Sequence, residues 1–214
     1  MNDPTTPKPR KERKANAERR RRQLLDAARQ SILRHGLART TLATVAEEAG
    51  LSQGVAVFYF KSKSGLLTET LRDLYQGYQT LWTEALEAAG PDPRDRLLAL
   101  IEADFKPEAC GPDVLPLWFA FWGELRFTAK YDQVAESFDQ HRRDALIGIW
   151  SELLPDRSPQ EVGQLAEWLD ILTDGYWQRL HLSPDSFDAQ LAVRATRDCL
   201  ARLTPELAGA VAPR

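Results

Sequence analysis

The chain has 214 residues, of which 43% are apolar and 28% are charged. This length suits one or two compact domains, and no segment approaches the roughly 18 consecutive apolar residues that a membrane-spanning helix needs. The charged N-terminus lacks the apolar segment of a secretory signal, and the two cysteines lie far apart without a CxxC motif. We therefore expect a cytoplasmic protein with reduced thiols, no metal site and no cofactor.

The net charge of −3 combines two parts of opposite sign. Residues 1–63 contain fourteen Lys or Arg and six Asp or Glu, whereas residues 64–214 contain fourteen basic and twenty-five acidic residues. This division is expected when only the N-terminal part contacts a polyanion. A solvated basic tail would give the same charge balance. Whether the basic part binds a polyanion therefore has to be judged from its predicted structure.

The first residues predict an arm followed by a helix. Residues 1–15 hold three prolines and many charges but no bulky apolar side chain, which predicts a disordered basic arm. From about residue 16 apolar residues recur on one helical face. Gly36 suits the left-handed position that ends such a helix. The apolar face consists of Leu24, Leu25, Ala28, Ile32 and Leu33.

Two short helices follow. A threonine N-cap at Thr40-Thr41 begins the first of them, over about 42–49, and Gly50 ends it after two turns. Ser52 can cap the second, which runs from Gln53 to about residue 60. Two short helices joined by a glycine-containing turn are typical of a helix-turn-helix. We therefore assign residues 16–63 to a DNA-binding domain.

The second short helix predicts a recognition surface. Ala56 and Phe60 lie one turn apart and should face the core, which leaves Val57, Phe58 and Tyr59 on the outside. Such exposed apolar residues on a small basic domain are consistent with insertion into the major groove. The alternative is that these three side chains pack against the first or the fourth helix.

In the groove, Gln53 could pair bidentately with adenine, and Val55 or Val57 could pack on thymine methyl groups. Hydroxyl and ammonium groups near helix ends suit phosphate oxygens. The predicted DNA contacts are Thr41, Gln53, Gly54, Val55, Val57, Phe58, Tyr59 and Lys63, with Thr41, Tyr59 and Lys63 on phosphates.

Residues 64–214 predict a helical ligand-sensing and dimerisation domain, because no alternating strand pattern occurs in them. The segment 107–113 is expected to be a loop. With the three N-terminal helices, the chain should be an all-α protein of about nine helices. The later helices are expected at about 64–89, 94–106, 114–128, 131–154, 159–181 and 188–203.

All six tryptophans lie outside the DNA-binding domain. Aromatic faces beside a carboxylate suit an organic cation, and Asp104, Glu124 or Asp174 could supply the negative charge. The alternative is that the rings are ordinary core between helices. The candidate ligand-binding residues are Asp104, Trp118, Phe121, Trp122, Asp174, Tyr176 and Trp177.

The stretch from Thr40 to Leu67 resembles the signature of TetR-family repressors, T(T)xxxVAxxAGxS followed by xGxxxxYFxxKxxLL. The resemblance implies a homodimer in which two helix-turn-helix domains bind a palindromic operator in double-stranded DNA. It also implies a C-terminal domain that binds a small-molecule inducer. The matching residues include Gly50, Ser52, Gly54, Tyr59, Phe60, Lys63 and Leu67.

Two later segments, 112–128 and 172–187, resemble the C-terminal domain of the choline-responsive BetI-type repressors. The LWxAFW and DGxWxRxxLSxDxF stretches carry this likeness. It implies choline or a related quaternary ammonium inducer, and the alternative is a TetR-type regulator of a different small ligand. In this family the last two helices, here 159–181 and 188–203, pair with those of the partner subunit.

Two other function classes have little support. The three histidines are scattered without HExxH spacing, and no GxSxG, Walker or GxGxxG motif occurs. We therefore expect no enzyme. A membrane-surface binder using the basic arm remains a rival, which the salt dependence of binding to a palindromic duplex would separate from a DNA-binding protein.

Overall fold

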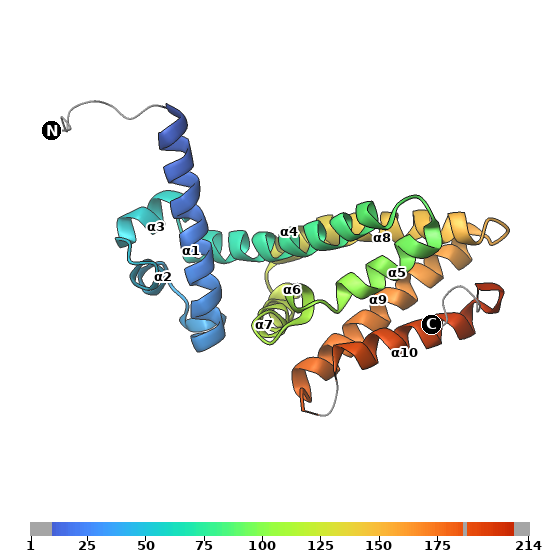
Figure 1. Cartoon of the computed structure of the whole chain (residues 1–214). Helices are drawn as coiled ribbons and strands as arrows, with labels where there is room; N and C mark the ends of the chain where they lie inside the picture. The colour runs from blue at the N-terminus through green and yellow to red at the C-terminus, as the bar shows by residue number, and fades with distance from the viewer. Residues whose placement is uncertain (1–9, 186–187, 208–214) are drawn as a thin grey trace. The chain divides into compact units, whose positions relative to one another are not determined.

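The computed structural model describes residues 10–185 and 188–207, and this part of the chain contains helices and no strand (Figure 1). The expected all-α fold is confirmed. The helices are α1 (Arg10–Arg39), α2 (Leu42–Glu48), α3 (Gln53–Phe60), α4 (Lys63–Ala89), α5 (Pro93–Asp104), α6 (Pro107–Cys110), α7 (Leu115–Leu125), α8 (Ala129–Leu153), α9 (Pro159–Leu182), α10 (Ala189–Leu203) and the 3₁₀ helix η1 (Pro205–Leu207).

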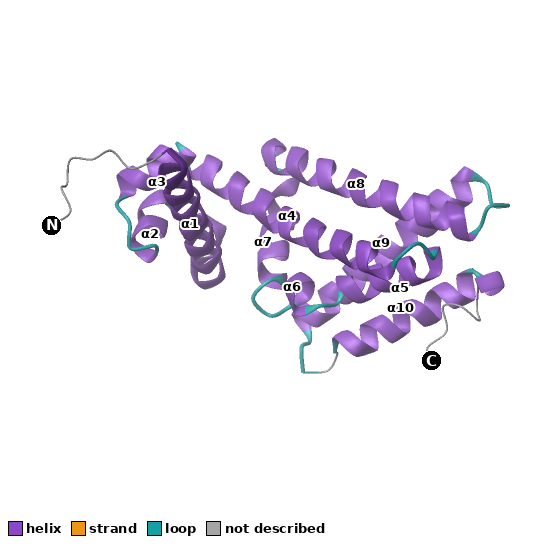
Figure 2. Cartoon of the chain, turned by 45° about the horizontal axis from the view of Figure 1, so that its top comes forward, coloured by secondary structure: helices purple, strands orange, loops and turns teal. Residues whose placement is uncertain are grey.

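The chain divides into two compact units, one reaching Asp73 and the other beginning at Leu74. Both units are helical in their described residues (Figure 2). The expected boundary at residue 63 falls inside the N-terminal unit, because the first turns of α4 are tied to α1. Arg22 and Arg29 each donate to the carboxylate of Asp73, at 2.7 and 2.8 Å.

Helix α1 begins earlier than the sequence predicts. Residues 10–15, expected to be disordered, form its first turns; the rest of the expected arm, residues 1–9, lies outside the described residues. The absence of bulky apolar side chains was a misleading signal, because Lys, Arg, Glu and Ala are strong helix formers. Gly36 has the predicted left-handed backbone, with φ 76°, and one further turn reaches Arg39.

The three N-terminal helices enclose the core that their apolar spacing predicts. Leu25 and Ala56 are fully buried, and Phe60 is 4% exposed. Thr41 caps α2 in a reciprocal arrangement with Thr44. Ser52 occupies the N-cap position of α3, but its side chain makes no capping hydrogen bond.

In the C-terminal unit, α8 packs on α9 and α5, while α10 packs on α9 and α5. Its helices follow the expected ranges with one correction: the segment expected to be a loop contains α6. Pro107 begins this single turn, and the amide of Gly111 closes it by donating to the carbonyl of Pro107 at 2.8 Å. None of the helices that the structure describes is long and apolar enough to cross a membrane.

Two phenylalanines of α3 provide a matched test of this packing. Phe60→Ala should lower the free energy of unfolding by about 3–5 kcal/mol, because it empties a packed site. Phe58 is 67% exposed, so Phe58→Ala should change it by no more than about 0.5 kcal/mol. Urea unfolding followed by circular dichroism measures both. Similar losses for the two variants would contradict the assigned burial.

Candidate functional site

The outer face of α3 is the first candidate site. Gln53 and Gly54 are exposed, and Val57 and Phe58 keep 40% and 67% of their surface accessible. Val55 is half-buried against the core of the N-terminal unit. The exposed residues thus lie on the face opposite the buried one, as a recognition helix requires.

The expected phosphate contacts differ in how they are held. Tyr59 is half-buried and packs on the core of the N-terminal unit, while the ammonium of Lys63 donates to the carbonyl of Ala38. Thr41 is fixed by its capping role. Sequence reasoning missed Lys61, which is exposed and lies 5.3 Å from the ring centroid of Phe58. The available signal was the KSKS segment 61–64, of which Lys61 is the first residue.

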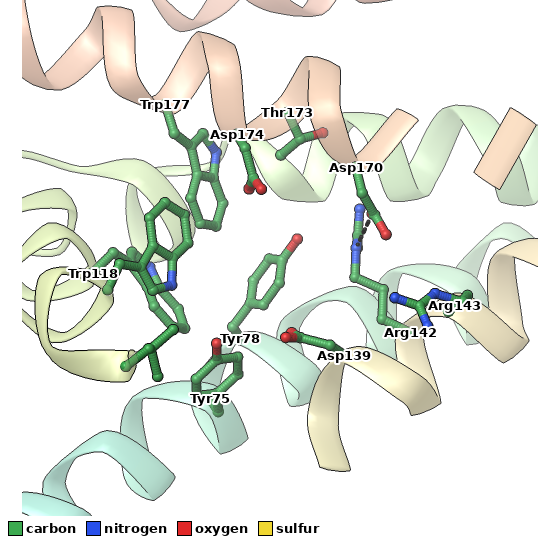
Figure 3. A pocket seen from close by; sticks show the side chains of 12 residues that line it. Tyr75, Tyr78, Trp118, Asp139, Arg142, Arg143, Asp170, Thr173, Asp174 and Trp177 are labelled. Atoms are coloured by element: carbon green, nitrogen blue, oxygen red, sulfur yellow. Dashed lines mark hydrogen bonds and ion pairs between the residues drawn. The ribbon is translucent and has the colours of Figure 1, made fainter. Parts of the chain in front are cut away.

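The second candidate site is a cavity of about 340 Å³ in the C-terminal unit, lined by α4, α7, α8 and α9 (Figure 3). Its lining combines aromatic rings with charged side chains. The lining residues are Tyr75, Tyr78, Trp118, Trp122, Leu125, Asp139, Arg142, Arg143, Asp170, Thr173, Asp174 and Trp177.

Five aromatic rings form one wall of the cavity. The indole of Trp177 stacks with those of Trp118 and Trp122, at centroid distances of 5.8 and 6.1 Å. Tyr75 and Tyr78, from α4, approach Trp118 edge-on at 4.8 and 5.9 Å. Such contacts fix the ring orientations, so the wall presents preformed π surfaces.

Two carboxylates, Asp139 of α8 and Asp174 of α9, point into the space in front of these rings (Figure 3). Neither has a hydrogen-bond or ion-pair partner in residues 10–185 and 188–207. Burial, reinforced by the nearby charge of Asp170, raises the pKa of Asp174 to about 7 and that of Asp139 to about 6. Both side chains nevertheless keep exposed surface, and an opposite charge beside either carboxylate would favour its ionised form.

Asp104, at the end of α5, is fully buried and lies outside the cavity lining. Its carboxylate accepts hydrogen bonds from the hydroxyl of Tyr78 at 2.7 Å, from Nη2 of Arg142 at 2.7 Å and from the hydroxyl of Thr173 at 3.1 Å. Its backbone carbonyl accepts from the indole of Trp177 at 2.8 Å. Asp104 thus positions residues that line the cavity but does not line it.

The guanidinium of Arg142 also donates from Nε to Asp170 at 2.9 Å. Burial opposes its positive charge, but Asp104, Tyr78 and Asp170 outweigh that effect and raise the pKa of Arg142. Arg142 therefore shares one positive charge between Asp104 and Asp170. Asp139 and Asp174 are the lining carboxylates without an ion-pair partner among the described residues, and the exposed guanidinium of Arg143 also lines the cavity.

The structure brings four of the expected ligand-binding residues to this cavity: Trp118, Trp122, Asp174 and Trp177. Phe121 is instead buried, with its ring against Tyr131 at 5.5 Å. Tyr176 faces Phe105 at 6.2 Å, away from the cavity lining, and Glu124 is exposed outside it.

Sequence reasoning missed eight lining residues. The spacing of Asp139 and Arg142 puts them on one face of a helix, as does that of Asp170 and Asp174, and this pattern was an available signal. The missed residues are Tyr75, Tyr78, Leu125, Asp139, Arg142, Arg143, Asp170 and Thr173.

This arrangement suits an organic cation. Aromatic faces attract a cation by about 0.5–2 kcal/mol each where water is excluded, and the unpaired carboxylates supply the opposite charge. No cluster of potential metal ligands occurs among the residues that the structure describes.

Two family models match the chain. Residues 24–70 match the model for bacterial regulatory proteins of the tetR family, and residues 93–205 match the model for the C-terminal domain of BetI-type transcriptional repressors. The first match covers the helix-turn-helix, and the second covers all of the lining helices except α4.

Similar whole proteins agree with these matches. The HTH-type transcriptional regulator BetI of Paraburkholderia xenovorans strain LB400 is 34% identical over 181 residues, which cover 85% of this chain and 91% of that protein. A crystal structure of a transcriptional regulator from Pseudomonas aeruginosa PAO1 has a TM-score of 0.81 at 26% identity, covering 89% of this chain and 92% of the other. A regulator from Saccharomonospora viridis in complex with choline has a TM-score of 0.75 at 21% identity, covering 86% and 96%.

The raised pKa of Asp174 predicts a pH-dependent effect of Asp174→Asn. Because the folded protein holds this proton more tightly than the unfolded chain, the contribution to stability is full below about pH 4 and is lost as the pH rises through about 7. Asparagine mimics the protonated form, so Tm should rise relative to the parent at pH 8 and match it near pH 4. Thermal unfolding at both pH values measures this.

Asp113→Asn is the control, because Asp113 is exposed and does not line the cavity. Its Tm difference from the parent should be the same at both pH values. The prediction is contradicted when Asp174→Asn behaves in the same way as this control.

Proposed function

We propose that this chain is a repressor induced by choline or a related quaternary ammonium compound. The chain belongs to the TetR family and carries a BetI-type C-terminal domain. One observation supports this class of ligand: two carboxylates without ion-pair partners among the described residues, Asp139 and Asp174, face an aromatic wall. The choline that accompanies the Saccharomonospora viridis regulator supports the same class.

The DNA-binding part of the proposal rests on the exposed face of α3. Gln53 would pair with adenine, while Val57 and Phe58 would contact thymine methyl groups. Gly54 would allow close approach, and Val55 would contribute only its accessible part. The remaining contacts, to phosphates, are assigned to Thr41, Tyr59 and Lys63.

The operator is proposed to be a palindrome bound by a homodimer. Exposed apolar residues occur on α9 and α10, the helices that resemblance assigns to the partner interface; they are Trp168, Ile171, Leu182 and Leu191. Two recognition helices related by a two-fold axis would bind half-sites roughly 34–36 Å apart. The dimer would present both only when their separation matches this spacing.

Induction is proposed to be a population shift. Tyr75 and Tyr78 line the cavity from α4, and Asp73 of the same helix, two residues before Tyr75, is ion-paired to Arg22 and Arg29 of α1. The protein would exist in two states that place these tyrosines differently, and the ligand would bind one state more tightly than the other. The change in DNA affinity can be no larger than the ratio of the ligand's affinities for the two states. A regulator of another organic cation would use the same coupling, so ligand identity is a separate question.

The ligand assignment is tested by thermal unfolding with choline, other quaternary ammonium compounds and polyamines. A ligand at 100 times its Kd should stabilise the protein by about 2.7 kcal/mol, and choline should weaken DNA binding. Trp122→Ala should abolish both effects while keeping DNA affinity, because Trp122 lines the cavity and is only partly buried.

Phe127→Ala provides the control, since this ring is 78% exposed and does not line the cavity. It should respond to choline as the parent does. Unchanged DNA affinity of the parent at saturating choline would refute choline as inducer, and stabilisation by another compound would identify the alternative.

The DNA assignment is tested by selecting duplexes from a random library and then measuring affinity for the recovered sequence. Gln53→Ala should lose about 1–3 kcal/mol for each half-site, or roughly 5- to 150-fold per contact, and relax specificity at one base pair of each half-site. Gln30→Ala, at an exposed position of α1, should bind as the parent does. Recovery of single half-sites without inverted symmetry would contradict the dimer on a palindrome.

A further inference from the structure

The first turns of α1 are helical without contributing to the core. Between Lys11 and Arg20 only Asn16 is even half-buried, and the first fully buried side chain of this helix is Leu24. An isolated helix this short is marginal in water, because most helical stability in proteins comes from packing of an apolar face. This segment has no such face.

The basic residues of α1 whose side chains are described fall into two groups, those with a partner and those without. Arg21, Arg22 and Arg29 pair with acidic residues of α4 and stabilise the N-terminal unit. Arg34 pairs with Glu48, and Arg19 and Arg39 donate hydrogen bonds to Asn16 and to the carbonyl of His35. The second group is exposed and has no hydrogen-bond or ion-pair partner in the described part of the chain. It consists of Lys11, Arg13, Lys14 and Arg20, and we call it the α1 basic group.

The position of the α1 basic group is unfavourable for the free protein. Cations near a helix N-terminus oppose the helix dipole, and like charges one turn apart, such as Lys11 and Lys14, repel each other. The first turn offers only Glu12 in compensation. A polyanion would reverse each of these effects, since it would neutralise the four charges together.

The same group lies on the side of the N-terminal unit where α3 is found. The N-terminal end of α1 extends past α3 and away from α2 (Figure 1), and it lies towards α3 in the second view (Figure 2). At 1.5 Å per residue, the segment from Lys11 to Arg20 is roughly 14 Å long. It therefore offers a charged surface beyond the reach of the recognition helix itself.

We infer that the α1 basic group is a second DNA-contact surface, which binds phosphates flanking the base pairs that α3 contacts. The inference rests on the proposed DNA binding but assigns residues outside the helix-turn-helix. Because these contacts go to phosphates, they add affinity without adding sequence preference. They also add to the salt dependence, by about 0.9 in the slope of log K against log salt for each phosphate contacted.

The test compares the parent with the quadruple variant Lys11→Gln, Arg13→Gln, Lys14→Gln and Arg20→Gln. Glutamine keeps a high helix propensity, and none of the four positions is in the core. Binding to the selected duplex and to a mixed-sequence duplex of equal length is measured over a salt series. The slope should fall by about 0.9 per lost phosphate contact, up to about 7 for a dimer, while the affinity ratio of the two duplexes stays constant.

The matched control removes the same charge from the C-terminal unit, at exposed positions without ion-pair partners among the residues described. It is the quadruple variant Arg94→Gln, Lys106→Gln, Arg126→Gln and Lys130→Gln. Its slope should equal that of the parent. Trimming the flanks of the selected duplex should weaken the parent and the control but not the α1 variant.

Three outcomes overturn the inference. One is a slope reduction below about 1 in the α1 variant while the parent binds DNA; another is an equal reduction in the control variant, which would reveal a general effect of net charge. The third is loss of binding to anionic phosphatidylserine vesicles with an unchanged DNA slope, which would assign the group to a membrane surface. A parent that binds neither duplex would instead refute the proposed DNA-binding function.

Discussion

The buried carboxylate of Asp104 is the interaction on which the architecture of the C-terminal unit depends. Its partners come from α4, α8 and α9, while Asp104 itself ends α5. Removing one partner of a buried ion pair typically costs about 3–5 kcal/mol, because the other charge remains without compensation. Four helices therefore meet at one buried, hydrogen-bonded carboxyl group, and the residues that bind it also line the cavity.

This network also determines which charges are available to a ligand. Asp170 and Asp104 share the single positive charge of Arg142. Asp139 and Asp174 have no such partner, and partial burial raises the pKa of both, although both side chains keep exposed surface. A cation beside them would favour their ionised forms. In the proposed function, this charge interaction is what would favour a positively charged ligand.

Periodicity was sufficient where one face of a helix is buried and the other is not. It predicted Ala56 and Phe60 in the core and Phe58 outside, because α3 contacts its neighbours on one side only. It did not predict that Asp104, a candidate ligand-binding residue, is fully buried and outside the cavity lining. Burial by three other helices is a tertiary property, which local spacing does not contain. The tyrosines of α4 were missed as cavity-lining residues for the same reason. From sequence, a ring that faces inward cannot be distinguished from a core residue, because the cavity beside it is a tertiary feature.

The two units illustrate opposite uses of charge. In the N-terminal unit, the pair of Arg22 with Asp73 is partly exposed, with 46% and 15% of the two side chains accessible, and a pair of this kind stabilises the fold less than a buried one. In the C-terminal unit, the pair of Arg142 with Asp104 is buried, and its geometry cannot relax without exposing an unpaired charge. Asp73 and the cavity-lining Tyr75 lie only two residues apart on α4. In the proposed mechanism, a ligand that contacts Tyr75 and Tyr78 would therefore act on α4 next to the residue that pairs with α1.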